Sequence, residues 1–408
     1  MELKNISTQE VKKTDFLNNN PITNKVNDLK SKDIYPFFRE VYSAQTDTAN
    51  FGGKDVLMFG SNNYLGLNNH PEVKKASQDA ISKYGTSCTG SPFMNGTLDL
   101  HRHLEDELKE FLNQEAVIIF PTGFQVNSGV IPALSGKNDA ILMDELNHAS
   151  IIDGCQLSFA KRVKYKHNLA SDLDKKLAGL ANTSINNKLI VTDGIFSMDG
   201  DIAKLNEIVP VAKKHNAMVM VDCAHAIGVI GKNGAGTASH FGLDNDVDLI
   251  GGTFSKSLAS VGGFIAGSKS LIEYLSHASR TYMFSASLPP AATASAIAAL
   301  KIIKADNSYQ QKLWENTYFA IKLMKSKGLD IGYAETPIIP VYIRSSAKTF
   351  LIAKALFDKG VYVNPVVAPG VKENDALLRF SLTASHSKEQ IIYAIEQIAQ
   401  ITNKFLSL

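Results

Sequence analysis

The stretch AMVMVDCA, residues 217–224, is an apolar run that ends in an aspartate. Apolar runs of this length without alternation are typical of strands buried on both faces of a parallel sheet. Because helix-like patterns separate this run from others of its kind, we expect an α/β fold with a mostly parallel sheet flanked by helices. The other runs, also bounded by Gly, Asp or Asn, are AVIIF (116–120), AILM (140–143), KLIVTDG (188–194) and DLIGG (248–252).

The pattern changes after Leu288. A long helical segment is followed by strand-like PIIPVYI, VYVNP and LLRFSL and by a closing helix from Lys388, which indicates a smaller α+β domain. Near the other end, a polar tail precedes a helix that we predict at 24–43. We therefore predict three parts, which are a tail and helix at 1–55, a large α/β domain at 56–288 and a small C-terminal domain at 289–408.

Composition excludes several classes of protein. Among the 408 residues, 44% are hydrophobic and 20% are charged, which is ordinary for a globular protein. The 42 basic and 40 acidic side chains nearly cancel, so no strong field recruits nucleic acid. The three cysteines, Cys88, Cys155 and Cys223, form no disulfide or zinc pattern and fit a reducing compartment.

No targeting or membrane-spanning segment is predicted. The N-terminal MELKNISTQEVKKTDFLNNN is polar and lacks the apolar core of a signal peptide. The most apolar helical stretch, Pro290 to Ile303, is too short to cross a bilayer. We expect a cytoplasmic protein that meets any lipid substrate at the inner membrane face or on a carrier.

Polar side chains follow the predicted strands, and ligands of open α/β sheets bind at that edge. One of them is a lysine, Lys256, in the small and apolar stretch GGTFSKSLASVGGFIAG (251–267). Burial of an ammonium group is costly, so a lysine placed there needs a reason. We expect one crevice to collect Thr122, Gly123, Phe124, Asp193, Ser197, Asp222, His225, Thr253, Ser255 and Lys256.

A buried lysine that shares a crevice with an aspartate suits a Schiff base to pyridoxal phosphate. Asp222 would keep the pyridine nitrogen of that cofactor protonated. Desolvation would lower the pKa of Lys256, so that its free amine forms the imine and later moves protons. His225 can reach the phenolic oxygen, and His148 of DELNHASIIDG can lie over the ring.

The cofactor phosphate needs backbone N–H groups at a helix N-terminus together with hydroxyl groups. Gly123 and Phe124 would supply the N–H groups. Thr253 and Ser255 would supply the hydroxyls, and Ser197 follows a neighbouring strand into the same crevice.

Each of these residues, taken alone, also has a structural interpretation. An aspartate at a strand end is usually a turn or cap residue, and His148 could cap a helix. The glycines of GVIGKNGAG (228–236) resemble a nucleotide loop but lack the preceding strand that such a loop needs. Asp222 and His225 could begin a metal site, yet no second ligand cluster completes it. Only the order and spacing of the whole set favour the cofactor.

The set resembles the α-oxoamine synthase family of fold-type I pyridoxal-phosphate enzymes over nearly the whole chain. That resemblance implies a seven-stranded, mostly parallel sheet in the large domain. The stretches that carry it are SNNYLGL (61–67), NGTLDLHRHLE (95–105), FPTGFQVN (120–127), DELNHASIIDG (144–154), TDGIFSMDGD (192–201), VDCAHAIGVIGKNGAG (221–236), GTFSKSLASVGGFIAG (252–267), FSASLPP (284–290) and LLRFSL (377–382).

The resemblance also implies a role for each matching residue. Lys256, His148, Asp222 and His225 are then the catalytic residues, and Asn62 and Arg379 bind the substrate carboxylate. The family works as a homodimer, and Ser287 would reach the phosphate of the neighbouring subunit. The residues implied to bind the cofactor are Gly123, Phe124, His148, Ser197, Asp222, His225, Thr253, Ser255, Lys256 and Ser287.

MFGSNNYLGL, DGIFSMDGDI and NPVV are most similar to the bacterial branch of the family that condenses L-serine with a long-chain acyl-CoA. That reaction gives 3-ketodihydrosphingosine, CoA and carbon dioxide in sphingolipid synthesis. Two positions depart from the family pattern. Cys223 stands where Asp or Glu is usual, and we expect it to face away from the ring. Pro92 stands where Arg is usual, which leaves the amino acid and the acyl donor open.

Alternatives therefore remain. Within the family, the amino acid could be glycine or cysteate, as in sulfonolipid synthesis, and the acyl donor could be an acyl carrier protein. A non-catalytic regulatory homologue would lack the lysine, whereas Lys256 is present. A nucleotide-binding dehydrogenase would carry a glycine fingerprint after its first strand, and none is there.

Overall fold

The computed structural model describes residues 20–407 of the chain. These residues divide into two compact units, 20–39 and 40–407. The elements that could form a site at a sheet edge all belong to the second unit.

The first unit contains helix α1 (Pro21–Ser31), which Asn20 caps through its side-chain oxygen. The helix predicted at 24–43 is therefore too long. Asp33 adopts a left-handed backbone conformation with φ of 52°, and Pro36 disfavours helical geometry in the residue before it. Both features end the helix early.

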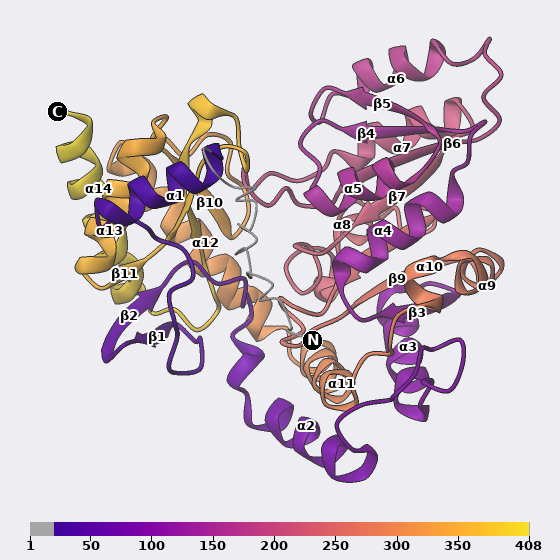
Figure 1. Cartoon of the computed structure of the whole chain (residues 1–408), viewed down its shortest axis with the longest axis horizontal. Coiled ribbons are helices and arrows are strands. Elements are labelled where there is room, and N and C mark those ends of the chain that lie inside the picture. Colours follow the sequence, from indigo (N-terminus) through magenta and orange to yellow (C-terminus); the bar gives the residue numbers. More distant parts are fainter. Residues whose placement is uncertain (1–19, 408) are drawn as a thin grey trace, which may run out of the picture. The chain divides into compact units, whose positions relative to one another are not determined.

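The second unit is built on a seven-stranded sheet with the order β3-β9-β8-β7-β6-β4-β5. All neighbouring pairs are parallel except those that β9 makes with β3 and β8, which confirms the mostly parallel sheet. Figure 1 shows β4 to β7 side by side. The strands are β3 (Ala116–Phe120), β4 (Ala140–Asp144), β5 (Lys161–Tyr165), β6 (Lys188–Asp193), β7 (Met218–Asp222), β8 (Leu249–Thr253) and β9 (Gly263–Gly267).

Helices cover both faces of this sheet, and the alternation of side chains along each strand decides which face a residue joins. On β3, Val117 and Ile119 pack in one hydrophobic cluster, while Ile118 and Phe120 pack in another. The first cluster includes buried side chains of α3, α6, α7 and α11, and the second those of α4, α5 and α9. The apolar runs lack a polar face because neither face meets water.

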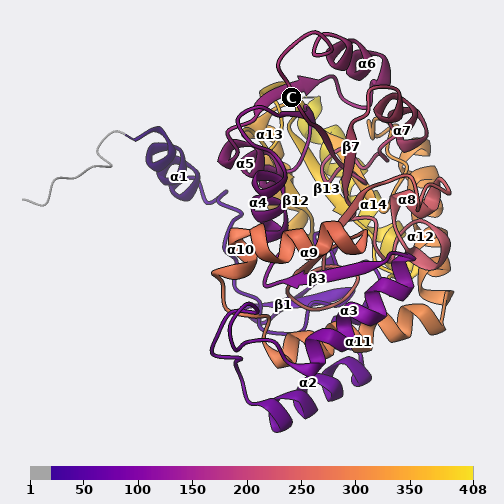
Figure 2. The ribbon, with the colours of Figure 1, turned by 90° about the vertical axis from the view of Figure 1, so that its right-hand side faces the viewer.

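Figure 2 shows α2, α3 and α11 together below β3, with α11 packed against α2 and α3, and α3 packed against β3. The helices of the second unit are α2 (Pro71–Tyr84), α3 (Asp99–Leu112), α4 (Gly123–Leu134), α5 (Ala149–Leu157), α6 (Ala170–Ala178), α7 (Leu205–Lys214), α8 (Thr237–His240), α9 (Lys269–Ala278), α10 (Arg280–Met283), α11 (Pro290–Ala305), α12 (Ser308–Ser326), α13 (Ser346–Asp358) and α14 (Lys388–Leu406).

Two smaller sheets involve the C-terminal part. In one, β13 (Leu377–Ser381) lies between β10 (Ile338–Tyr342) and β12 (Asn364–Val366), all antiparallel. In the other, β2 (Lys54–Met58) lies between β1 (Thr48–Phe51) and β11 (Val361–Tyr362). The predicted strand VYVNP is thus divided between two sheets. The predicted domain boundaries stay predictions; they fall inside β2 and between α10 and α11.

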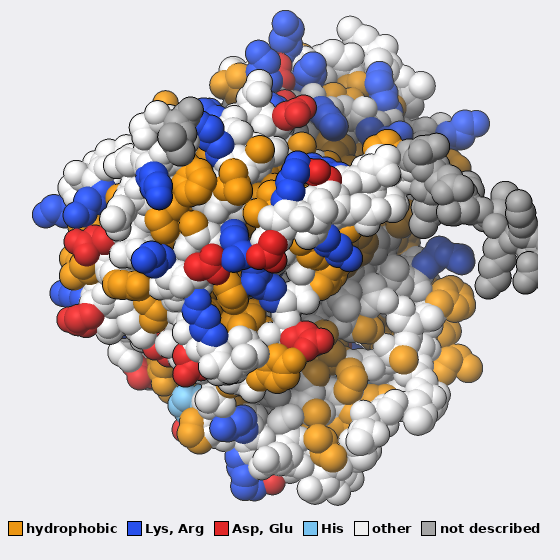
Figure 3. Space-filling view, turned by 60° about the vertical axis from the view of Figure 1, so that its left-hand side comes forward, with side chains coloured by type: hydrophobic (Ala, Val, Ile, Leu, Met, Phe, Trp, Pro, Cys, Tyr) orange, Lys and Arg blue, Asp and Glu red, His pale blue; other side chains and the backbone are white. Residues whose placement is uncertain are grey.

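Charge is mixed on the face shown in Figure 3, where Lys and Arg side chains are interspersed with Asp, Glu and hydrophobic side chains. Within residues 20–407, none of the helices combines the length and the apolar character that a membrane span needs.

Candidate active site

Three neighbouring parallel strands end in polar residues at one edge of the large sheet. β6 ends at Asp193, β7 at Asp222 and β8 at Thr253. Asp193 pairs in register with Asp222, and Asp222 with Gly251 of β8. The carboxyl ends of these strands therefore place their polar side chains together, as the sequence predicts.

Asp222 is buried with both carboxylate oxygens engaged. Its Oδ2 accepts a hydrogen bond of 2.6 Å from Nδ2 of Asn127, and its Oδ1 accepts one of 2.9 Å from the backbone N–H of Ala224. Asn127 also donates to Oγ of Ser150 at 2.9 Å. These contacts fix the orientation of the carboxylate without neutralising it, so it remains available to a cationic group of a ligand.

Lys256 follows β8 and is half-buried. Burial, helped by the cation of Arg379 and opposed by the charge of Asp222, lowers the pKa of its amine to about 8. A fraction of the amine is therefore uncharged near neutral pH. A lysine of this kind can act as a nucleophile or as a base.

His148 is the N-cap residue of α5 and lies beside two carboxylates. Its backbone N–H donates to Asp193 Oδ2 at 2.7 Å. Its Nδ1 accepts a hydrogen bond of 3.2 Å from the backbone N–H of Ser150, so the neutral ring carries its proton on Nε2. Burial lowers the pKa of His148, although the charge of Asp222 opposes this.

His225 is buried, and its Nδ1 lies 2.7 Å from the hydroxyl of Tyr64. Burial lowers the pKa of His225 well below its usual value, and the cations of Lys256 and Arg379 act in the same direction. The ring is therefore neutral and can exchange a hydrogen bond with a ligand without adding charge to the site.

The predicted phosphate cradle lies where α4 begins. Thr122 caps the helix by accepting from the N–H of Gln125 at 3.1 Å, which leaves the N–H groups of Gly123 and Phe124 in the unpaired first turn. A Cβ on Gly123 would lie 2.9 Å from Cβ of Thr253, so only glycine allows this close approach.

The two predicted hydroxyl ligands differ in their availability. Oγ1 of Thr253 donates to the carbonyl oxygen of Gly262 at 2.9 Å and lies 2.9 Å from Oγ of Ser255. Ser255 is exposed. Since Thr253 has only one hydroxyl proton, Ser255 is the better donor to an anion.

Arg379 of β13 is buried and contacts the loop that follows β6. Its Nε donates to the carbonyl oxygen of Ser197 at 2.5 Å, and its Nη1 donates to Oγ of Ser381 at 2.8 Å. Its Nη2 lies 3.4 Å from the hydroxyl of Tyr64. Ser197, predicted to bind the cofactor, thus contacts Arg379 through its backbone.

Tyr64 joins several of the predicted residues, although the sequence did not single it out. Its hydroxyl donates to Oδ1 of Asn62 at 3.3 Å and also contacts His225 and Arg379. Asn127, which holds Asp222, was missed as well. Both residues lie within stretches that carry the family resemblance, SNNYLGL and FPTGFQVN, and that is the signal that could have found them.

Ser287 lies in the connection between α10 and α11. Its N–H donates to the carbonyl oxygen of Gly90 at 2.9 Å, and its Oγ is buried without a hydrogen-bond partner among the described residues. It borders a small cavity of about 10 Å³ together with Pro92 and Glu105. Its predicted reach into a neighbouring subunit stays a prediction.

Cys223 is fully buried beside Asp222 and packs in the core near Gly236. Burial raises the pKa of its thiol to about 12. A neutral, enclosed thiol is a poor nucleophile, and the tolerance of this departure from the family pattern stays a prediction.

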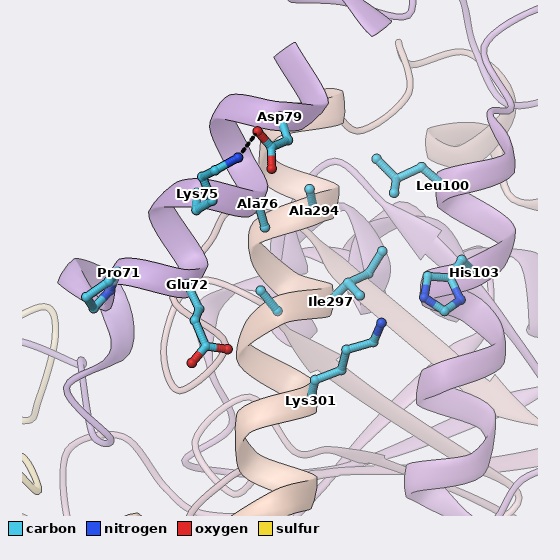
Figure 4. A pocket seen from close by; sticks show the side chains of 11 residues that line it. Pro71, Glu72, Lys75, Ala76, Asp79, Leu100, His103, Ala294, Ile297 and Lys301 are labelled. Carbon is cyan, nitrogen blue, oxygen red and sulfur yellow. Dashed lines mark hydrogen bonds and ion pairs between the residues drawn. The ribbon is translucent and has the colours of Figure 1, made fainter. Parts of the chain in front are cut away.

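A larger groove, of about 620 Å³, lies apart from these residues between α2, α3 and α11. Figure 4 shows Ala76, Ala294 and Ile297 along the groove and the ion pair of Lys75 with Asp79 on α2. None of the predicted site residues lines it. The groove is therefore separate from the predicted site residues.

Comparisons with known proteins give consistent results. The sequence profile of aminotransferase class I and II matches residues 54–398. A serine palmitoyltransferase of Sphingobacterium spiritivorum is 53% identical over 93% of this chain and 94% of its own. An 8-amino-7-oxononanoate synthase of Thermoanaerobacter pseudethanolicus is 43% identical over 93% of this chain and 96% of its own.

Comparison with solved structures also finds serine palmitoyltransferases. A serine palmitoyltransferase of S. paucimobilis with a bound PLP–myriocin aldimine matches with a TM-score of 0.92 and 34% identity, covering 97% of this chain and 100% of that one. A serine palmitoyltransferase of Sphingomonas wittichii matches with the same TM-score at 35% identity, also over 97% of this chain and 100% of that one.

Proposed function

The chain belongs to the aminotransferase class I and II family, and we propose that it is a pyridoxal-phosphate enzyme that condenses L-serine with a long-chain acyl-CoA. The products are 3-ketodihydrosphingosine, CoA and carbon dioxide. The observation that carries the proposal is the meeting of Lys256, Asp222 and two neutral histidines at one sheet edge. Similarity to serine palmitoyltransferases over more than nine-tenths of the chain supports serine and an acyl thioester as substrates.

The residues at the sheet edge fit the cofactor. Asp222 offers a fixed carboxylate to the pyridine nitrogen, and His225 offers a neutral ring to the phenolic oxygen. The first turn of α4, closed by Gly123, offers N–H groups to the phosphate together with Ser255. When bound, the cofactor withdraws electrons from the amino-acid Cα and so stabilises negative charge there.

The chain itself supplies the proton chemistry. Lys256, with a pKa of about 8, would hold the cofactor and would serve as the base for the α-proton of serine. His148, whose neutral ring carries its proton on Nε2, would lie against the cofactor ring and could donate to the substrate.

Arg379 and Asn62 would bind the substrate carboxylate. The guanidinium is buried, and its planar fork of N–H donors suits a carboxylate held by two parallel hydrogen bonds. The hydroxyl of Tyr64 contacts both residues and also His225. It therefore links the proposed carboxylate ligands to the histidine proposed to contact the cofactor.

We propose further that two copies of the chain form a homodimer. The loops at 89–94 and 283–286 line a hollow of about 510 Å³, and Met94 and Phe284 beside it are 77% and 72% exposed. Ser285 in this hollow accepts a hydrogen bond of 3.0 Å from Gln125 of α4, so the exposed apolar surface adjoins the phosphate cradle. The molar mass from light scattering should be twice that of the chain, and a mass of one chain at micromolar concentration would contradict the dimer.

The function is tested with a panel of amino acids and palmitoyl-CoA. We expect L-serine to perturb the visible absorbance of the bound cofactor at lower concentration than glycine or cysteate does. Mass spectrometry should then detect the aminoketone formed from serine. If the protein preferred cysteate or glycine, that amino acid would be the substrate instead of serine. If it preferred an acyl carrier protein to CoA, the carrier protein would be the acyl donor.

Arg379→Ala should weaken serine binding about ten- to a hundredfold, because a charged hydrogen-bonded contact is worth roughly 1.5–3 kcal/mol. Titration of the cofactor absorbance with serine measures this constant, while the KM for palmitoyl-CoA should change little. Arg344, an exposed arginine paired with Asp330, gives the matched control variant Arg344→Ala. Unchanged binding of every amino acid by Arg379→Ala would place the carboxylate site elsewhere.

A further inference from the structure

His167, in the connection between β5 and α6, lies between two carboxylates. Its Nδ1 is 3.0 Å from Asp144 Oδ1, and its Nε2 is 2.8 Å from Asp201 Oδ2. A neutral imidazole has only one N–H, whereas both ring nitrogens here face acceptors. The geometry therefore requires two donors, which is the imidazolium form.

The surroundings of His167 favour this charge. Burial by itself lowers its pKa, but the hydrogen bonds and charges of Asp144 and Asp201 outweigh burial and raise the pKa to about 10. The backbone N–H of His167 also donates to Glu145 at 3.4 Å, which adds a third carboxylate. The side chain is 22% exposed and Asp144 is completely buried, so water screens the interaction with Asp144 only weakly.

Asp201 lies near the end of the loop at 194–202. His167 contacts this loop at two residues, Asp201 and Phe196. The edge of its ring packs on Phe196, with ring centroids 4.4 Å apart and an interplanar angle of 88°. The next residue, Asn168, donates to Asp201 Oδ2 at 2.7 Å. Gly200 turns the loop with φ of 70°.

The same loop contacts Arg379, which we propose to bind the substrate carboxylate. The carbonyl oxygen of Ser197 accepts from Nε of Arg379 at 2.5 Å, and Asp199 accepts from the hydroxyl of Tyr342 at 2.7 Å. The loop is thus a bridge with His167 at one end and the guanidinium of Arg379 at the other. A shift of the loop would turn the guanidinium, because Nε is one of its anchored atoms.

We propose that His167 is a positioning residue whose charged ring, clamped between Asp144 and Asp201, orients Arg379 for the substrate carboxylate through Ser197. Nothing in the proposed chemistry requires His167 to touch substrate or cofactor. The inference rests on the proposed function for the role of Arg379. The clamp itself stands on the contacts of the loop alone.

His167→Gln tests the proposal, because glutamine retains one donor but carries no charge. The matched control is His215→Gln, since His215 pairs with Asp174 at 2.5 Å and makes no hydrogen bond to 194–202 among the described residues. The first measurement is hydrogen exchange of 194–203 in the purified full-length protein. We expect these amides to exchange about tenfold faster in His167→Gln, and at the native rate in His215→Gln.

The second measurement is the binding of serine and palmitoyl-CoA. We expect the apparent Kd of serine to rise about tenfold in His167→Gln while the KM of palmitoyl-CoA changes less than twofold. Unchanged exchange of 194–203 would overturn the clamp. The link to Arg379 would be overturned if His167→Gln showed faster exchange but bound serine with native affinity. It would also be overturned if the variant lost affinity for serine and for palmitoyl-CoA equally. Failure of the native protein to bind any amino acid would overturn the proposed function instead. The hydrogen-exchange comparison would still test whether His167 holds the loop.

Discussion

Lys256→Ala should abolish turnover, with an expected loss of at least ~10³-fold, while the chain stays folded. The variant loses both the group that binds the cofactor covalently and the base for the α-proton. Product formation from serine and palmitoyl-CoA measures the loss. Borohydride treatment followed by peptide mass spectrometry should fix the cofactor to the peptide that contains Lys256 in the native protein, and to no peptide of the variant.

The matched control is Lys269→Ala, since Lys269 is an exposed lysine at the start of α9 outside the site. It should keep native turnover and the cofactor adduct at Lys256. Native turnover by Lys256→Ala would refute the assignment. A thermal unfolding curve of the variant distinguishes loss of chemistry from loss of fold.

Asp222→Asn should reduce turnover about a hundredfold or more, because it removes a preorganised charge that stabilises the reacting state. The amide keeps the shape of the side chain and can still accept from the N–H of Ala224. It lacks the charge that keeps the pyridine nitrogen protonated, so the bound ring no longer withdraws electrons as strongly. Exchange of the α-proton of serine with deuterium, followed by NMR, should slow with turnover.

Cofactor retention separates the two variants. Asp222→Asn should still bind the cofactor through Lys256, whereas Lys256→Ala should not bind it covalently. Asp248→Asn is the control, because Asp248 precedes β8 at the opposite edge of the sheet and accepts from the N–H of Val219 at 2.7 Å. Native proton exchange in Asp222→Asn would show that another group holds the pyridine nitrogen.

The buried strands of the large sheet could be predicted from the sequence almost residue by residue. AVIIF coincides with β3, and the other four runs each contain most of one strand. Two strands of the large sheet were not predicted, because their positions in the sheet give them an unusual composition. KRVKY, at the edge of the sheet as β5, is charged on its exposed side, and GFIAG, as antiparallel β9, has glycines where close packing needs them.

The candidate residues also came from the sequence, since motif order and spacing determine which side chains follow which strand. The large sheet then explains why Asp193, Asp222 and Thr253 meet, because parallel neighbours present the same end. The lowered pKa of Lys256 was predicted from its apolar stretch, and the structure agrees. The neutral state of His225 could not be predicted in this way, because it depends on burial and on the cations of Lys256 and Arg379, which are distant in the chain.

The sequence by itself determined the sheet, the family and the set of polar groups, because hydrophobic periodicity and local motifs are written along the chain. Only the tertiary structure decided how those groups are held. Tyr64 meets His225 and Arg379 across sequence separations of 161 and 315 residues, and Ser197 meets Arg379 across 182. No local pattern encodes such contacts. They arise when the C-terminal strands pack beside the sheet edge, and the hydrogen-bond needs of buried polar groups then fix the partners.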